Sequence, residues 1–195
     1  MDMNVLLFED FETLDAFGPA EVFGYVEGCR LRFLSMTGGV VGSKQGLEVV
    51  TDPIDVADAS AVLLIPGGYG TRPLICDETF LEALHGIVAD AQYCLTVCTG
   101  SALLAKTGLL DGRKATSNKR SFEWVRSVNE AVDWVACARW VTDGKFYTAS
   151  GVSAGIDMAL GFVCDRFGRT AAEEIATQIE YVWHEDKDTD PFARI

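Results

Sequence analysis

The stretch Tyr93-Cys94-Leu95-Thr96-Val97-Cys98-Thr99-Gly100-Ser101 decides the fold. Its first five residues form the largely apolar run that is typical of a strand buried on both faces of a sheet. The run leads directly into Cys98, and the small residues after it continue into a helical pattern that ends near Gly108. So abrupt a turn crowds the backbone, and a glycine two positions after the turning residue relieves the crowding. The stretch therefore predicts a nucleophile elbow that presents Cys98.

The rest of the chain alternates strand and helix patterns. Strands are expected at Val5–Phe8, Leu31–Leu34, Ala61–Ile65, Lys114–Thr116, Trp134–Val135, Trp140–Val141 and Phe146–Ala149, with a hairpin-like excursion over Val40–Val50. Helices are expected at Leu14–Tyr25, Glu78–Asp90, Ala102–Lys106, Ser121–Val128, Ser153–Phe167 and Thr170–Trp183, before an irregular tail, His184–Ile195. This alternation predicts an α/β fold, a flavodoxin-like open parallel sheet with helices on both faces. We expect one domain over residues 1–195, because this length suits a single core.

Three turns are candidates for a functional site. In an open α/β sheet the site lies beyond the carboxyl ends of the strands, and chemistry-bearing residues follow Phe8, Ile65 and Val97. At the elbow, the N-terminus of a helix favours a thiolate, which predicts a lowered pKa for Cys98. The N–H of Thr99 is expected to face a developing oxyanion. After Ile65, the backbone of Gly67 and Gly68 can approach a ligand closely and is expected to complete that anion site.

A reactive thiol also needs a proton carrier nearby. The turn after the first strand offers Glu9, Asp10, Glu12 and Asp15, of which the last two are three residues apart and can share a helix face. Asp15 stands in an apolar stretch, so burial is expected to raise the pKa of its carboxyl. The two histidines are poor candidates, because His85 lies in a predicted surface helix and His184 in the charged tail.

Composition excludes several function classes. The net charge of −13 and the pI near 4.5, without a basic cluster, argue against nucleic-acid binding. No apolar run approaches the roughly 20 residues of a membrane span, and the N-terminus does not resemble a signal peptide, so we expect a cytoplasmic protein. The six cysteines form no CxxC pair, so we expect no metal site and no disulfide framework. Apart from Cys98 they are expected to be small buried hydrophobes.

The assembled motifs resemble the ThiJ/PfpI superfamily, which shares the class I glutamine amidotransferase-like fold. The resemblance covers nearly the whole chain, and within the superfamily it is greatest to isonitrile hydratases and to the N-terminal domains of AraC-like regulators. The stretches that carry it are Leu14–Pro19 with Glu21–Phe23, Ile65–Gly68, Val97–Ser101, Gly108–Thr116, Gly151–Asp157, Ile179–Tyr181 and Pro191–Phe192.

The resemblance implies a mechanism and an assembly. In the hydratase branch a cysteine at the position of Cys98 attacks the isonitrile carbon. An aspartate at the position of Asp15 transfers protons and activates water, giving an N-formamide, and the residue at Thr99 shapes the anion site. No cofactor is implied, the substrate is a small molecule, and a homodimer with sites near the interface is expected.

Two departures from the family pattern leave alternatives open. Many members carry a histidine after an Ala-Thr-Thr stretch, where this chain has Ser117-Asn118-Lys119, so Cys–His–Glu chemistry is not supported. Glu12 lies near the glutamate of the chaperone and deglycase branches, so Asp15 and Glu12 both remain candidate partners of Cys98. The sequence is compatible with a cysteine-dependent hydratase or hydrolase and, alternatively, with a ligand-binding or oxidative-stress-sensing module in which Cys98 is the redox-sensitive residue.

Overall fold

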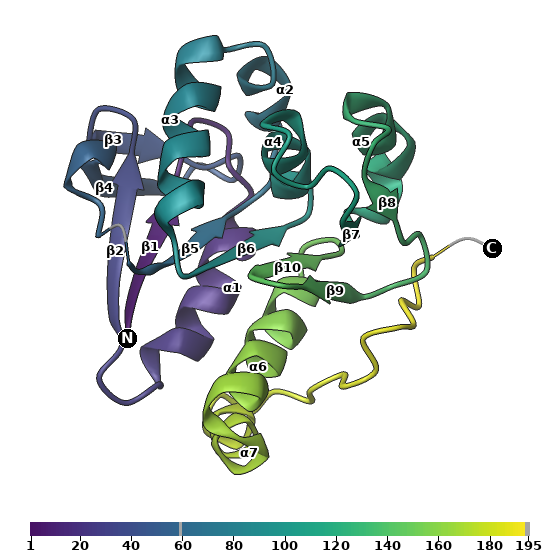
Figure 1. Cartoon of the computed structure of the whole chain (residues 1–195). Helices are drawn as coiled ribbons and strands as arrows, with labels where there is room; N and C mark the ends of the chain where they lie inside the picture. The colour runs from purple at the N-terminus through teal and green to yellow at the C-terminus, as the bar shows by residue number, and fades with distance from the viewer. Residues whose placement is uncertain (59, 194–195) are drawn as a thin grey trace.

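A computed structural model describes residues 1–58 and 60–193. The central feature is an eight-stranded sheet with the order β3-β4-β2-β1-β5-β6-β10-β9, accompanied by a separate two-stranded sheet, β7-β8 (Figure 1). The strands are β1 (Asp2–Leu6), β2 (Arg30–Ser35), β3 (Gly39–Gly42), β4 (Glu48–Pro53), β5 (Val62–Ile65), β6 (Tyr93–Val97), β7 (Lys114–Ala115), β8 (Asp133–Trp134), β9 (Trp140–Asp143) and β10 (Phe146–Ala149). Only β3 and β9 run antiparallel to their neighbours in the large sheet, so the predicted α/β, mostly parallel architecture is confirmed.

Helices cover both faces of this sheet, as expected. They are α1 (Thr13–Gly24), α2 (Thr71–Leu74), α3 (Glu78–Asp90), α4 (Gly100–Lys106), α5 (Phe122–Val128), α6 (Ala154–Phe167) and α7 (Arg169–Gln178), with 3-10 turns at Ile54–Val56 and Lys119–Ser121. The helices α1, α6 and α7 pack together on one face, while α2, α3, α4 and α5 lie on the other (Figure 1). The turns that follow the parallel central strands therefore meet at one end of the sheet.

The central strands are buried on both faces. All four residues of β5 and of β10 are buried, and β6 is buried from Cys94 to Val97. Within β6 the register places Val97 opposite Ala149 of β10 and Thr96 opposite Ile65 of β5. A parallel strand that is buried on both faces carries apolar residues at successive positions, so the continuous apolar runs in the sequence predicted these strands.

The last predicted helix is too long at its C-terminal end. It was expected to reach Trp183, but α7 ends at Gln178 and Glu180 adopts a φ of 51°. Beyond that point the chain is fixed by tertiary contacts, since the Tyr181 hydroxyl and the Trp183 indole both donate to Asp157 of α6. No Pro or Gly marks this end, so the local sequence does not signal it.

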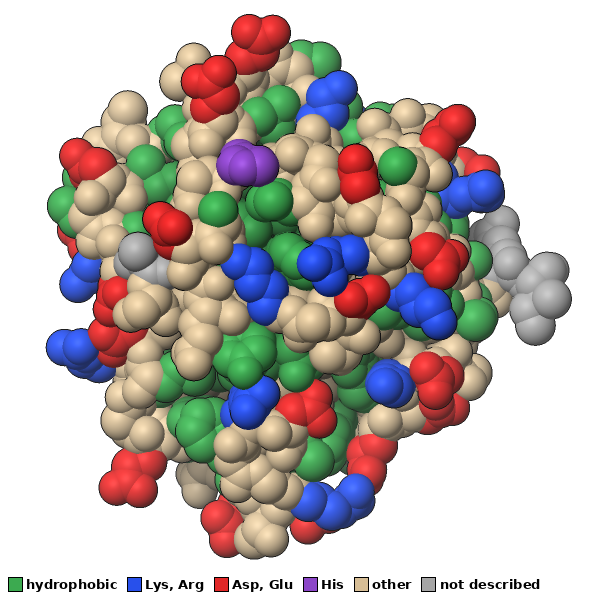
Figure 2. Space-filling model, in the orientation of Figure 1, with side chains coloured by type: hydrophobic (Ala, Val, Ile, Leu, Met, Phe, Trp, Pro, Cys, Tyr) green, Lys and Arg blue, Asp and Glu red, His purple; other side chains and the backbone are tan. Residues whose placement is uncertain are grey.

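The distribution of charged side chains and cysteines agrees only in part with what the composition predicts. Acidic and basic side chains are interspersed on the face that Figure 2 shows, with apolar areas between them. Within residues 1–58 and 60–193, no helix has the length and apolar character needed to cross a membrane. The expectation of buried cysteines is correct for Cys94 but wrong for Cys76 and Cys137, which are exposed on loops.

Candidate active site

The elbow at Cys98 has the strained geometry that its sequence predicts. Cys98 has a φ of 57°, in the left-handed region that residues with a side chain rarely adopt. The surrounding structure holds it there, because its N–H donates to the carbonyl of Ser150 at 2.8 Å. The hydroxyls of Ser101 and Ser117 donate to its carbonyl at 3.0 and 2.8 Å. Strain held in place by several contacts is typical of a functional position.

Gly100 is essential to the packing of the elbow. A Cβ at this position would lie only 2.7 Å from the Pro66 carbonyl oxygen, which is backbone and has little room to move. We expect Gly100→Ala to lower the free energy of unfolding by about 2 kcal/mol or more. In contrast, Gly86→Ala in α3, where nothing lies within 4 Å of the added Cβ, should raise it by about 0.5–1 kcal/mol. Urea unfolding of both variants tests this, and an equal effect of the two changes would contradict it.

Asp15 is fully buried in α1 and lies next to the elbow. Its Oδ2 accepts a hydrogen bond from the Gly67 N–H at 2.9 Å, while its Oδ1 has no hydrogen-bond partner among the described residues. Burial, opposed by the Gly67 N–H and the Cys98 thiol and assisted by the charge of Glu12, raises the pKa of this carboxyl to about 7. The expected rise is confirmed, and it places the proton affinity of Asp15 in the range that suits a general base near neutral pH.

Glu12 occupies a different position from Asp15, although the two are near neighbours. It is the residue before α1, its N–H donates to the Gly67 carbonyl, and its Oε1 accepts a hydrogen bond from Gln45 at 2.6 Å. Its carboxylate is therefore engaged with Gln45, and its charge acts on Asp15 rather than on Cys98. The carboxyl that acts on the Cys98 thiol in this structure is that of Asp15.

Gly67 and Gly68 do not offer free N–H groups, contrary to the expectation that they complete an anion site. The Gly67 N–H is bonded to Asp15, and the Gly68 N–H donates to the Thr99 hydroxyl at 3.1 Å. Their role in this structure is close approach: a Cβ at Gly67 would lie 2.7 Å from the Thr99 Oγ1 and 2.9 Å from Asp15. The two glycines let three turns of the chain meet around Cys98.

The predicted direction of the Cys98 pKa is wrong. Burial raises the pKa of this thiol well above its ordinary value, and the nearby carboxylate of Asp15 raises it further. The backbone N–H groups of Thr99 and Val152 and the Thr99 side chain lower it, but by less than burial raises it. The sulfur is therefore a neutral thiol at neutral pH and needs a base, which Asp15 can supply.

Val152 is the site residue that the sequence analysis missed. It lies in the turn between β10 and α6 with a φ of 45°, an unfavourable conformation for a β-branched residue, and its N–H faces the Cys98 thiol. The signal was present, because residues 151–157 belong to the stretches that resemble the superfamily. The turn follows a strand of the central sheet, so the carboxyl-end rule applies to it as well.

A cavity of about 950 Å³ opens beside this turn, and we call it the elbow cavity. It is lined by Asn118, Lys119, Arg120, Phe122, Glu123, Ala136, Ser150, Gly151, Val152, Ser153, Pro191, Phe192 and Ala193. Neither His85, on the exposed face of α3, nor His184, whose ring contacts the Thr189 carbonyl, belongs to the lining.

The C-terminal segment forms one wall of the elbow cavity because buried charges hold it in place. Arg139 bonds Asp157 with its Nε at 2.7 Å, and its Nη1 lies 3.7 Å from an oxygen of Asp190 in that segment. Backbone bonds add to this, since the Asp190 N–H donates to the Cys137 carbonyl at 2.7 Å. In Figure 1 the segment, in yellow, leaves α7 and passes β9 towards α5 and β8. This path brings Phe192 to the cavity.

We expect Asp157→Asn to release this wall. The change leaves the Arg139 charge with a weaker partner, and breaking a buried pair costs about 3–5 kcal/mol. Amide exchange at Arg139 and Asp190 should therefore become faster than in the unsubstituted protein. The control is Asp165→Asn on the exposed side of the same helix, which should cost less than about 1 kcal/mol. Unchanged exchange in Asp157→Asn would contradict this account of the wall.

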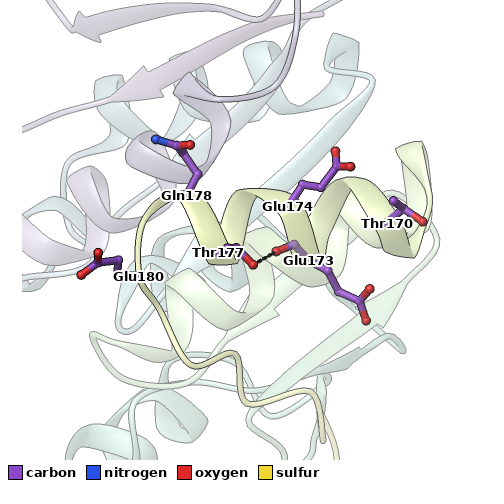
Figure 3. Close-up of a pocket in the computed structure, with 6 residues that line it drawn as sticks. All are labelled: Thr170, Glu173, Glu174, Thr177, Gln178 and Glu180. Atoms are coloured by element: carbon purple, nitrogen blue, oxygen red, sulfur yellow. Dashed lines mark hydrogen bonds between the residues drawn. The ribbon is translucent and has the colours of Figure 1, made fainter.

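A second hollow is formed by residues that are far from Cys98 in the sequence. It measures about 640 Å³ and is lined by Thr170, Glu173, Glu174, Thr177, Gln178 and Glu180 of α7 and the residues after it (Figure 3). Its lining holds three glutamates but no thiol, histidine or basic group. Across the part of the chain that the structure describes, no three His, Cys, Asp or Glu side chains are grouped to hold a metal ion.

Comparison with known proteins agrees with this architecture. Residues 1–164 match the sequence profile of the DJ-1/PfpI family. Isonitrile hydratase of Pseudomonas putida is 30% identical over 182 residues, which are 93% of this chain and 78% of that protein. The HTH-type transcriptional regulator GbdR of Pseudomonas aeruginosa is 31% identical over 92% of this chain, which spans only 50% of the regulator. The crystal structure of a ThiJ/PfpI family protein from Pseudomonas syringae superimposes with a TM-score of 0.85 at 30% identity, covering 97% of this chain and 76% of that one.

Proposed function

Because the chain belongs to the DJ-1/PfpI family, we propose that it is a cysteine-dependent enzyme that hydrates a small electrophile, an isonitrile, as a hydro-lyase. The observation that carries the proposal is the buried carboxyl of Asp15, with a pKa of about 7, beside a thiol that burial keeps protonated. A neutral thiol adds to an electrophile efficiently only when a base removes its proton during the attack. The similarity to isonitrile hydratase supports the choice of electrophile.

The proposed cycle balances with water as the only co-substrate. Asp15 takes the thiol proton while the sulfur bonds to the isonitrile carbon, and Asp15 then delivers that proton to the same carbon, giving a thioimidate. Water adds to this carbon, and Asp15 accepts one of its protons and passes it to the nitrogen, which gives a tetrahedral intermediate with an N–H and a hydroxyl. The carbon–sulfur bond then breaks while the hydroxyl proton moves through Asp15 to the departing sulfur, and an N-substituted formamide leaves. The N–H groups of Thr99 and Val152, which favour the charged sulfur, stabilise it as it departs.

The same observations argue against the oxidative sensor as the primary role. Redox-sensor cysteines are solvent-accessible and have a low pKa, since the thiolate is the species that oxidants attack. Burial raises the pKa of Cys98, and only 7% of its surface is exposed. The sensor reading keeps support from the similarity to regulators, so it remains the alternative.

Turnover of a simple isonitrile tests the proposal. Purified protein is incubated with cyclohexyl isonitrile, and formation of N-cyclohexylformamide is followed by mass spectrometry. We expect steady turnover with one oxygen from labelled water in each product molecule. Absence of product, together with stoichiometric sulfenic or sulfinic acid at Cys98 under mild peroxide, would support the sensor instead.

We also propose a homodimer, located in the cytoplasm. Leu14 and Tyr69 are exposed apolar side chains next to Asp15 and Gly68, where a second copy would cover them. The cysteines in the described residues are free thiols, which is typical of a reducing compartment. Light scattering coupled to gel filtration tests the dimer, and a mass close to the 21.2 kDa of one chain would contradict it.

A further inference from the structure

The elbow cavity differs in character from one end to the other. Ser150, Gly151 and Val152 line the end next to Cys98, where the Ser150 carbonyl accepts the Cys98 N–H. Ser150 is almost completely buried, and its hydroxyl has no hydrogen-bond partner among the residues the structure describes. Elsewhere the lining is open to solvent, because Arg120 and most of Phe192 are exposed. Cys98 does not itself line the cavity, and Val152, whose N–H faces the thiol, is the lining residue that connects the two.

Charges around the cavity are paired, with one exception. Glu123 lies 3.3 Å from Arg126, and Lys119 lies 4.0 Å from Asp190 while also donating to the Thr116 hydroxyl and the Ala138 carbonyl. Within the described part of the chain, the Arg120 guanidinium has neither an ion pair nor a hydrogen bond. The cavity mouth therefore carries a net positive charge on a protein whose overall charge is −13.

The remaining walls are apolar. Phe122 and Phe192 face the cavity from α5 and from the C-terminal segment, and Ala136 and Pro191 add to the same lining. Rings of this kind pack against an apolar ligand body. The volume of about 950 Å³ exceeds what a small electrophile alone needs, and it is ample for a ligand with both an apolar body and a polar end.

We propose that the elbow cavity selects electrophiles that carry a carboxylate at the end remote from the reacting carbon, with Arg120 as its partner and the two phenylalanines around the apolar body. This inference rests on the proposed function for the reaction, but the binding preference is independent of it. A guanidinium presents paired donors that match the two oxygens of a carboxylate. The unpartnered Ser150 hydroxyl is available to bond the reacting end.

Two alkylating reagents of nearly equal size test the preference without any need for turnover. One reagent is the iodoacetamide of 4-aminomethylbenzoate, whose anionic carboxylate lies across an aromatic ring from the reacting carbon, and the other is its neutral methyl ester; both convert a thiol to a thioether with loss of iodide. The rate ratio of the two reagents at Cys98 is measured by mass spectrometry, with exposed Cys76 as the internal reference. We expect the ratio at Cys98, relative to Cys76, to fall about three- to fivefold in Arg120→Gln.

Two variants serve as controls for the Arg120→Gln result. Arg120→Lys keeps the charge and should retain most of the ratio, while Lys106→Gln removes an exposed cation outside the cavity and should leave it unchanged. An equal fall in Arg120→Gln and Lys106→Gln, or no fall in either, would overturn the proposal. Failure of Cys98 to react with either reagent would overturn it as well, because the cavity would then not lead to the thiol.

The substrate form of the proposal is tested with 4-(isocyanomethyl)benzoate and its methyl ester. Wild-type protein should have the higher kcat/KM for the carboxylate, and Arg120→Gln should lower this value about three- to fivefold while the value for the ester stays the same. If neither isonitrile is hydrated but the alkylation ratio still depends on Arg120, the proposed reaction fails and the carboxylate preference stands. If both are hydrated equally well in both proteins, the preference fails and the reaction stands.

Discussion

Cys98→Ala is expected to lose isonitrile hydration by at least about 10⁴-fold, because the substitution removes the sulfur that forms the proposed covalent intermediate. The substitution removes one buried sulfur atom and leaves the backbone of the elbow unchanged. Initial rates of formamide formation measure the effect, and circular dichroism checks that the fold persists. Cys76→Ala, which alters an exposed cysteine far along the chain from the elbow, is the matched control and should keep full activity.

The same variant distinguishes covalent catalysis by Cys98 from direct activation of water by Asp15. If Cys98→Ala still hydrates isonitriles at a rate within about tenfold of the unsubstituted protein, the reaction does not pass through a thioimidate. In that case Asp15 would have to activate water directly. Cys98→Ser adds a second readout, since a serine hydroxyl in the same place is a much weaker nucleophile and should recover little of the lost rate.

Asp15→Asn is expected to reduce kcat/KM by about 10²- to 10⁴-fold, the usual contribution of a general base. Asparagine is close to aspartate in shape and can still accept the Gly67 N–H, so the change removes the base without removing its contact. In the unsubstituted protein the rate should rise with pH through about 7, the pKa of the Asp15 carboxyl, because only the ionised form takes a proton. This rise should be absent from the variant, and its persistence would show that another group is the base.

The stability of the protein should change in the opposite direction in Asp15→Asn. Folding raises the pKa of this carboxyl from 3.8 to about 7, so the folded state binds its proton more tightly than the unfolded chain does. The contribution of Asp15 to the free energy of unfolding is therefore greatest below about pH 4 and is lost as the pH rises through 7. At pH 8 we expect Asp15→Asn to melt at a higher temperature, with a gain of about 1–3 kcal/mol.

Asp157 is a second buried aspartate for which the same substitution should have the opposite effect on stability. Both aspartates are fully buried, but Asp157 is paired with Arg139 whereas Asp15 has no cation partner among the described residues. The same aspartate-to-asparagine change should thus stabilise the protein at position 15 and destabilise it at position 157. Thermal melts of the two variants at pH 8 measure the difference, and destabilisation in both would contradict the assignment of Asp15 as an unpaired buried charge.

The elements around the elbow were predictable because local sequence determines them. The predicted bounds of β6 and α3 agree with the structure, since continuous apolar residues define the strand, and Asp77 caps the helix by accepting the Phe80 N–H. The four-residue helix α2 was not foreseen, because Thr71–Leu74 is too short to show a period and contains a proline. The end of α7 was missed because contacts with Asp157, distant in the sequence, fix the chain there.

The candidate site was predictable in its residues more than in its electrostatics. The carboxyl-end rule identified the turns that carry Asp15, Gly67 and Cys98, and the structure brings all three together. The direction of the Cys98 pKa shift was not predictable from the sequence, because segments remote in the sequence bury the thiol. This burial raises the pKa by more than the N–H groups near the start of α4 lower it. The hydrogen bonds that occupy Gly67 and Gly68 likewise depend on tertiary contacts with Asp15 and Thr99.

The rate of Cys98 alkylation by iodoacetamide as a function of pH, in the unsubstituted protein and in Asp15→Asn, shows whether Asp15 is the base that deprotonates Cys98. If Asp15 is the base for a neutral thiol, the rate in the unsubstituted protein rises through about pH 7, where this carboxyl ionises. In the variant, that step is missing and the rate rises only where the thiol itself ionises. Superimposable profiles for the two proteins would show that Asp15 does not serve Cys98, and the proposed mechanism would be wrong.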